Sequence, residues 1–192
     1  MGWLNAEQLR SIGFRSVADD ALLSDKASYY NCANISVGPR SRIDDFCVLS
    51  AGEGGISIGA NVHVAVFSSL IGRGRITLED FSNISSRVAV YSSNDDYSGR
   101  SMTNPTVPPI FTAVTHSDVR VGRHVVIGSG SVILPGVTLH EGAAVGALSL
   151  VRSDCAAFQV YAGAPARVVG ARGRHLLELE QNYLSSLPRT PL

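Results

Sequence analysis

The chain is short of charge, of aromatic residues and of cysteine for its length of 192 residues. Charged residues make up 17% of it and cancel to a formal net charge of zero, which argues against a nucleic-acid-binding platform. No apolar run approaches the ~20 residues of a membrane-spanning helix, and the first residues lack a signal-peptide pattern. Three cysteines without metal-like spacing predict no disulfide framework, so we expect a cytoplasmic protein.

What the sequence has instead is a rhythm of six residues, which fits neither the 3.6-residue period of a helix nor the two-residue period of an open sheet. Aliphatic residues recur at this spacing. Four residues after most of them comes a small or β-branched side chain, as expected at the corners between short strands. The pattern predicts an all-β fold, a parallel β-helix of about five coils stacked roughly 4.8 Å apart. The aliphatic anchors come in sets of three: Val37, Ile43, Leu49; Ile58, Val64, Leu70; Leu78, Ile84, Val90; Val121, Ile127, Ile133; Leu139, Val145, Val151.

These anchors predict coils over residues 37–91 and 119–156, within a single domain spanning 1–192. Small insertions at 53–57 and 72–77 shift the register without ending the repeat. Cys47 and Cys155 fall on corner positions, where a small buried side chain is needed. We expect a short helix at 4–13 that covers one end of the coils and a second at 172–187 that closes the other end or clasps a neighbour.

The repeat breaks between residues 92 and 118, which form a long loop with several apolar side chains. A loop of this length inside a regular fold is usually functional or disordered, and the apolar residues favour an ordered excursion. Its polar side chains suit sugar hydroxyls, although Asn and Asp also favour turns for backbone reasons. The predicted substrate-binding residues of the loop are Asn94, Asp96, Tyr97 and Asn104, beside Asp95.

The coils, the late loop and the segment GAPAR at 163–167 resemble the hexapeptide-repeat acyltransferases. Within that family the galactoside, maltose and xenobiotic O-acetyltransferase branch looks most similar. The resemblance implies a left-handed β-helix, a homotrimer and acetyl-CoA bound between adjacent prisms, with a loop from one subunit covering the acceptor site. No metal is expected, and the lack of a long apolar run predicts no membrane insertion.

Glycine-rich corners then become candidates for coenzyme A. Ser129, Gly130 and Ala147 match family positions that meet the pantetheine arm, and their two runs are expected to lie one coil apart. The alternative is that glycine simply follows each repeat aliphatic. Towards the C-terminal end, basic residues favour contacts with the phosphates or the adenine end of coenzyme A, since arginine binds phosphate through paired charge-assisted hydrogen bonds. The alternative for each arginine is a solvated surface charge. The predicted contact set is Arg152, Gly163 and Arg167.

Acyl transfer to a hydroxyl needs a base, and histidine is the usual one because its pKa lies near neutral pH. The histidine of the galactoside and maltose enzymes falls on or beside Asp95, and a carboxylate is a weak base for a sugar hydroxyl. We favour His116, on the returning limb of the loop, oriented by Asp95 or Asp96. Other candidates are His63, on an outward face that lines a subunit groove and contacts substrate, and His124. A hydrogen bond at a subunit interface is the alternative for each histidine.

The sequence therefore predicts an acetyl-CoA-dependent sugar O-acetyltransferase, active on cell-surface polysaccharide (such as lipopolysaccharide) or on a glycoside. The alternative is N-acetylation of a nucleotide-linked amino sugar, whose amine is a better nucleophile and demands less of the base. A zinc enzyme of the γ-carbonic-anhydrase kind needs converging histidines, whereas His116 and His124 are separated by the loop return. A non-catalytic scaffold is a third possibility, against which the GAPAR segment argues.

Overall fold

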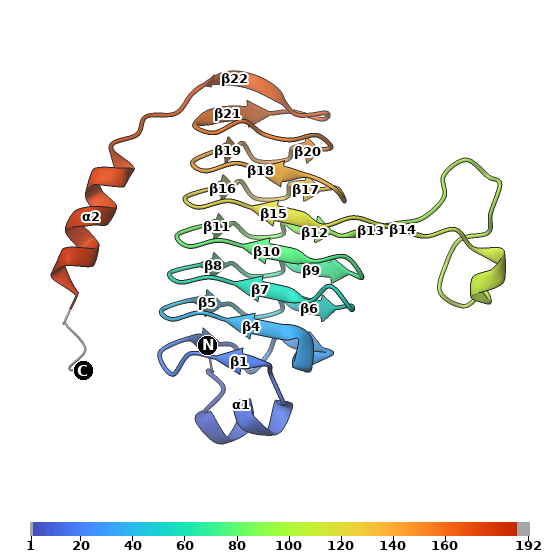
Figure 1. Ribbon diagram of the computed structural model, residues 1–192, viewed down its shortest axis with the longest axis horizontal. Coiled ribbons are helices and arrows are strands. Elements are labelled where there is room, and N and C mark those ends of the chain that lie inside the picture. The colour runs from blue at the N-terminus through green and yellow to red at the C-terminus, as the bar shows by residue number, and fades with distance from the viewer. Residues whose placement is uncertain (1, 188–192) are drawn as a thin grey trace.

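The computed structural model describes residues 2–187, and most of these wind into a three-sided column of parallel strands (Figure 1). Each side is one sheet in which a strand pairs with its equivalents in the coils above and below. The first face contains β1 (Ser16–Val17), β4 (Ile35–Val37), β7 (Ile56–Ile58), β10 (Ile76–Leu78), β15 (Val119–Val121) and β18 (Thr138–Leu139). The second contains β2 (Leu22–Leu23), β5 (Arg42–Ile43), β8 (His63–Val64), β11 (Asn83–Ile84), β16 (Val126–Ile127), β19 (Ala144–Val145), β21 (Gln159–Ala162) and β22 (Arg167–Ala171). The third contains β3 (Ser28–Tyr30), β6 (Val48–Ala51), β9 (Ser69–Gly72), β12 (Ala89–Tyr91), β17 (Val132–Ile133) and β20 (Leu150–Val151).

The core of the column is the set of aliphatic anchors that the six-residue rhythm predicts. Each of these anchors is buried, and none is more than 3% exposed. Corner side chains are buried too, including Cys47 and Cys155, which are fully inaccessible. Because one aliphatic per strand meets two others at the same level, the interior is filled coil by coil, and the predicted β-helix is confirmed.

A complete coil precedes the predicted start of the repeat at residue 37. β1, β2 and β3 pair in parallel with β4, β5 and β6, so the first and third faces each contain six strands, where we predicted about five coils. The six-residue spacing continues upstream through Val17, Leu23 and Tyr29. An aromatic residue occupies the third position, and the 3-10 turn η1 (Cys32–Asn34) then lengthens the corner, which explains why the pattern missed this coil.

The last coil ends in a hairpin that the sequence did not predict. β21 continues the second face in parallel with β19, and β22 then turns back antiparallel to β21. The GAPAR segment forms the connection between them, with Gly163 at φ +99°, where a residue with a side chain would be strained. The repeat therefore closes with an antiparallel strand at this end.

Both predicted helices are present. α1 (Ala6–Ile12) begins after Asn5, whose side chain accepts hydrogen bonds from the Glu7 and Gln8 amides, and it ends at Gly13 in the left-handed conformation. α2 (Leu176–Ser186) begins four residues later than predicted. Figure 1 shows it running back along the side of the column, so it does not cap the end.

Buried polar contacts hold α2 in this position. Glu180, which is 6% exposed, accepts hydrogen bonds from Arg123 (2.6 Å) and His124 (2.8 Å). Tyr183 donates from its hydroxyl to Asn61 at 2.9 Å, and the His124 ring stacks on Phe81. Because His124 is committed to this helix anchor, it is poorly placed to act as a base.

The long loop is an ordered excursion, as predicted. β13 (Ser93–Asn94) and β14 (Thr115–His116) form a two-stranded antiparallel ribbon, and the 3-10 turn η2 (Pro109–Phe111) lies beyond it. The ribbon carries the tip of the loop well away from the column (Figure 1). Apolar side chains near the tip, including Tyr97 (87%) and Ile110 (84%), are largely exposed. None of the helices within residues 2–187 has the length and apolar character to span a membrane.

Candidate active site

The irregular parts of the chain gather at one edge of the column, between the third and first faces. We call this the irregular edge and define it by the corners 31–34, 52–55 and 72–75 together with the loop 92–118. Neighbouring corners are bonded to one another: Gly54 N donates to Arg73 O at 2.9 Å, and Arg73 N donates to the Ser93 hydroxyl at 2.8 Å. The insertions that reset the repeat therefore form a continuous platform beneath the loop.

His116 is held at the base of this loop by its own ribbon. Ser93 and His116 are partners in the antiparallel pairing, and Ser93 Oγ lies 2.8 Å from His116 Nδ1. Since the Ser93 oxygen can accept a second hydrogen bond, a proton on Nδ1 would leave Nε2 as the basic nitrogen. The ring is solvent-exposed, and its orientation is fixed by one hydroxyl rather than by the predicted Asp95 or Asp96.

Two cavities flank the ribbon, and Asp95 lines both of them. One, of about 540 Å³, joins Asp95 with His116, Asn104 and Arg73. The other, of about 460 Å³, joins Asp95 with the remaining predicted substrate residues of the loop, Asn94, Asp96 and Tyr97. The structure thus brings the predicted loop residues to two sides of one carboxylate.

An ion pair at the wall of the first cavity was missed by the sequence analysis. Arg73 pairs with Glu53 at 2.5 Å, and both side chains are exposed. The hydrogen bond from Arg73 is the main cause that lowers the pKa of Glu53, and the charge of His116 adds to it. Both residues lie in the insertions at 53–57 and 72–77 that shift the register of the repeat. In the sequence, this pair was therefore marked only by two interruptions of the six-residue spacing.

Two predicted substrate residues also hold turns of the loop, which is the alternative that the sequence left open. Asp96 Oδ1 accepts from Ser98 N at 2.8 Å, and hydrogen bonds from Ser98 lower the pKa of Asp96. Asn104 Oδ1 accepts from the amide and hydroxyl of Thr106. Asp96 and Asn104 therefore line the cavities and also fix the turns of the loop that give the cavities their shape.

His63 lies on the second face, away from the loop cavities of its own chain. Its Nε2 is 2.9 Å from Asp44, whose other oxygen accepts from Arg42 Nε at 2.6 Å. Burial of the Asp44 carboxyl raises its pKa, but the hydrogen bonds from His63 and Arg42 outweigh this and hold the pKa below its ordinary value. Within one chain, His63 and His116 therefore belong to different sites.

The lowered pKa of Asp44 predicts an acid-sensitive contribution to stability. That contribution is complete above the unfolded-state pKa of about 3.9 and is lost as the pH falls through the folded-state value. The Asp44→Asn variant should therefore be less stable than the parent protein at pH 7, with a difference that shrinks below about pH 4. Urea unfolding across this range measures it, with Asp19→Asn, an exposed aspartate, as the matched control. A difference that stays constant with pH would contradict the prediction.

The two predicted glycine-rich runs lie one coil apart at the edge between the second and third faces. Leu148 N donates to Ser129 O at 2.9 Å, which stacks the Ala147 corner directly on the Ser129 and Gly130 corner. A Cβ at Gly130, where φ is +74°, would lie 2.7 Å from the Leu148 side chain. The two runs therefore stack one coil apart, with the exposed Leu148 side chain beside Gly130.

The predicted phosphate contacts meet at the hairpin end of the column. Leu150 N donates to Gly163 O at 2.9 Å, and Ala166 N donates to Leu150 O at 2.8 Å, so the GAPAR turn lies against β20. Arg152 and Arg167 leave this junction as exposed side chains, and neither forms an ion pair within the described part of the chain. Between residues 2 and 187 no three His, Cys, Asp or Glu side chains are grouped so as to hold a metal ion.

A triangular β-helix with an ordered polar loop and a glycine-lined edge is the architecture of acyltransferases built on a β-solenoid. The chain is 54% identical over 186 residues, 97% of each chain, to the dTDP-4-amino-4,6-dideoxy-D-glucose acyltransferase of Escherichia coli. It therefore belongs to the hexapeptide-repeat acyltransferase family. A putative lipopolysaccharide biosynthesis O-acetyl transferase of E. coli K12 is 30% identical over 71% of this chain and 68% of its own length. No family model matches the sequence.

Solved structures agree with this assignment. A single-residue mutant of AntD, an N-acyltransferase from Bacillus cereus, solved with dTDP and coenzyme A, has a TM-score of 0.92 at 41% identity, covering 97% of this chain and 100% of its own. A maltose O-acetyltransferase from Clostridium difficile shares the fold at a TM-score of 0.58 with 20% identity, covering 88% and 74% of the two chains. The expected kinship with the galactoside, maltose and xenobiotic branch is therefore corrected to a distant one, because the hexapeptide pattern is common to all branches and does not separate them.

Proposed function

We propose that this protein transfers an acyl group from acyl-CoA to the amino group of a nucleotide-linked amino sugar, specifically dTDP-4-amino-4,6-dideoxyglucose. The observation that carries this is the 54% identity over nearly the full length to an acyltransferase named for that sugar. AntD has also been solved with the same sugar nucleotide and coenzyme A. O-acetylation, our leading expectation from the sequence, has weaker support, in the 30% identical O-acetyl transferase.

An amine acceptor changes what the site must do. The amine lone pair attacks the thioester carbonyl, the C–N bond forms and the C–S bond breaks. The proton lost by nitrogen goes first to a proton acceptor of the protein and then to the departing coenzyme A thiolate. A carboxylate beside the amine favours this step, because it accepts a hydrogen bond from N–H and stabilises the positive charge that develops on nitrogen. We assign that role to Asp95, which lines both loop cavities, and the role of proton acceptor to His116.

The donor then lies along the glycine-lined edge. Ser129, Gly130 and Ala147 offer main-chain groups and little side-chain bulk to the pantetheine arm. Arg152 and Arg167, with Gly163 between them, offer charge to the phosphates. Acetyl-CoA is our expected donor. An acyl-CoA with a longer acyl chain is the alternative, since AntD has been solved with 3-hydroxybutyryl-CoA.

The loop supports an assembly in which neighbouring chains share each site. Its ribbon leads away from its own column, and its apolar tip lacks a cover within the described chain (Figure 1). A homotrimer would place that tip over an adjacent column and would pair the loop of one subunit with the glycine-lined edge of the next. We propose such a homotrimer, working in the cytoplasm on a precursor of a cell-surface glycan.

The His116→Gln variant tests the proton acceptor. It should lower kcat by about 10²-fold, at the low end of the range for a general base because an amine needs less help than a hydroxyl. The Kd of coenzyme A should stay within about twofold, since the substitution leaves all the residues assigned to hold coenzyme A unchanged. His175→Gln, at an exposed histidine near α2, is the matched control. Unchanged turnover in His116→Gln would remove this residue from the mechanism.

The acceptor is tested by release of free coenzyme A from acetyl-CoA. We expect rapid release with dTDP-4-amino-4,6-dideoxyglucose and only background release with a galactoside or maltose. The 4-hydroxyl analogue, dTDP-6-deoxyglucose, isolates the contribution of the amine. Faster release with the hydroxyl acceptors would overturn the proposal in favour of O-acetylation.

A further inference from the structure

A polar groove of about 390 Å³ lies on the first face, beside the irregular edge. Its floor is a ladder of hydroxyl side chains from three successive coils, because β4, β7 and β10 pair in register and bring Ser36, Ser57 and Thr77 into line. Arginines stand at both ends, Arg15 from before the first coil and Arg75 from the fourth. The groove lies outside the two loop cavities and contains no residue that we have assigned a role.

The two arginines of this groove are oriented by main-chain carbonyls and not by carboxylates. Arg15 Nε donates to Ala33 O and Arg75 Nε donates to Gly54 O, each at 3.3 Å. Over residues 2–187 neither guanidinium forms an ion pair, and the groove lining includes no Asp or Glu. By contrast Arg40, Arg73 and Arg120 are each paired with a carboxylate. The contacts to carbonyls orient both side chains through Nε and leave the terminal nitrogens of each guanidinium outside the ion pairs of the described chain.

The wall of the groove is a tight glycine corner. A Cβ at Gly54 would lie 2.4 Å from Arg75 N, and a Cβ at Gly55, where φ is +79°, would lie 2.8 Å from Asn34 O. These contacts explain why the insertion after β6 consists of glycine around Glu53. The insertion brings bare main chain to the groove and packs the corner that carries Arg75.

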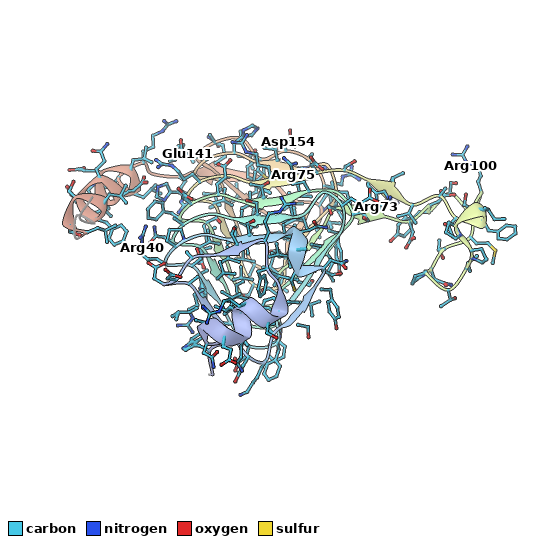
Figure 2. All side chains as sticks on the ribbon, turned by 60° about the horizontal axis from the view of Figure 1, so that its bottom comes forward. Arg40, Arg73, Arg75, Arg100, Glu141 and Asp154 are labelled. Atoms are coloured by element: carbon cyan, nitrogen blue, oxygen red, sulfur yellow. The ribbon has the colours of Figure 1, made fainter. Side chains whose placement is uncertain are left out.

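This groove adjoins the first loop cavity along the irregular edge. Arg75 N donates to Asp118 Oδ1 at 2.8 Å, and Asp118 follows His116 by two residues. On the other side Arg73, which lines the loop cavity, precedes Arg75 by two residues. Figure 2 shows Arg73 at the base of the loop and Arg75 on the neighbouring face of the column.

We propose that this groove binds the diphosphate of the acceptor nucleotide, between Arg15 and Arg75 and over the hydroxyl ladder. The inference rests on the proposed function for the identity of the acceptor. Guanidinium groups form paired charge-assisted hydrogen bonds with phosphate oxygens, and serine and threonine hydroxyls donate to the same oxygens. With the diphosphate held here, the attached sugar extends past Arg73 towards Asp95 and His116.

Calorimetric titration with dTDP alone tests this site without requiring catalysis. Arg75→Gln and Arg15→Gln should each weaken dTDP binding by about 10- to 100-fold, the loss expected for hydrogen bonds to a charged group. Ser57→Tyr should block the groove without removing charge. Arg40→Gln is the matched control, since Arg40 is also exposed but pairs with Asp20 at another edge. Each variant is checked for an unchanged melting temperature and unchanged affinity for coenzyme A.

Loss of dTDP affinity in Arg15→Gln, Arg75→Gln and Ser57→Tyr, but not in Arg40→Gln, supports the site. Parent-like affinity in Arg75→Gln and Ser57→Tyr overturns it, even if the protein acylates the amino sugar. Conversely, loss of dTDP binding in these variants of a protein that acylates no amino sugar would support the groove and reject the proposed function. Equal weakening of dTDP and inorganic pyrophosphate is expected, because the groove recognises the diphosphate and not the base.

Discussion

The Asp95→Asn variant should lose about 10²- to 10⁴-fold in kcat with dTDP-4-amino-4,6-dideoxyglucose, while it still binds coenzyme A and dTDP. Asparagine keeps the shape of the side chain but removes its charge. The developing positive charge on the amine then loses its counter-charge, and one acceptor atom becomes a donor. Asp95 is exposed in the loop, so the substitution should leave the melting temperature unchanged. Steady-state release of coenzyme A measures the effect.

Asp19→Asn controls for the loss of one exposed carboxylate elsewhere on the surface. The pH dependence of kcat in Asp95→Asn and in His116→Gln also assigns the two roles. A base and a charge-stabilising carboxylate change the kcat profile in different ways. If His116 is the base, the low-pH limb of the kcat profile should disappear in His116→Gln and remain in Asp95→Asn. An Asp95→Asn enzyme with parent-like kcat contradicts the mechanism proposed above.

Deletion of residues 95–114, with Asn94 joined to Thr115 through two glycines, should abolish turnover by at least about 10³-fold. None of the deleted residues is buried, and the loop leaves the column through the short ribbon of β13 and β14 alone. The column should therefore keep its melting temperature to within a few degrees. Circular dichroism and coenzyme A titration establish that the fold and the donor site remain.

Mixed assemblies then show which column the loop serves. The loop-deleted chain is combined with a full-length Ala147→Trp chain, in which the indole blocks the donor track. If each loop acts on a neighbouring subunit, the mixture regains activity that neither chain has alone. If each loop acts on its own column, the mixture stays inactive, and the shared site that we propose is wrong. The loop-deleted chain mixed with itself is the control.

The fold was predictable to the extent that it depends on a repeated local pattern. One aliphatic residue in every six marks one strand on one of the three faces, and each predicted anchor is buried. The first coil was missed because an aromatic residue, Tyr29, occupies its third anchor position and η1 lengthens the corner that follows. The pattern also fails at the hairpin of β21 and β22, because an antiparallel return depends on tertiary pairing and not on a period.

The candidate site was predictable only in part, for a related reason. His116, Asp95 and Asn104 lie in one loop, so a break in the repeat was enough to single them out, and the structure places them around one cavity. Arg73 and Glu53 come from separate corners, twenty residues apart, and meet only because coils stack. Arg15 and Arg75 are further apart still in sequence. To predict contacts of this kind, one must know the register between stacked coils, that is, which residue of one coil lies above which residue of the next. The spacing of the anchors does not determine that register across an insertion.

The stacking of the coils has a consequence for the evolution of substrate length. The groove occupies the second to fourth coils, and the glycine-lined track begins in the fifth, so the acceptor and donor sites that we propose lie at successive levels along the axis of the column. Each coil adds roughly 4.8 Å to the length of the column. Insertion of one whole coil between these levels would lengthen the span along the axis by that fixed increment and keep the contacts within each site. Relatives that accept longer carriers can therefore arise by discrete steps, without gradual remodelling of either pocket.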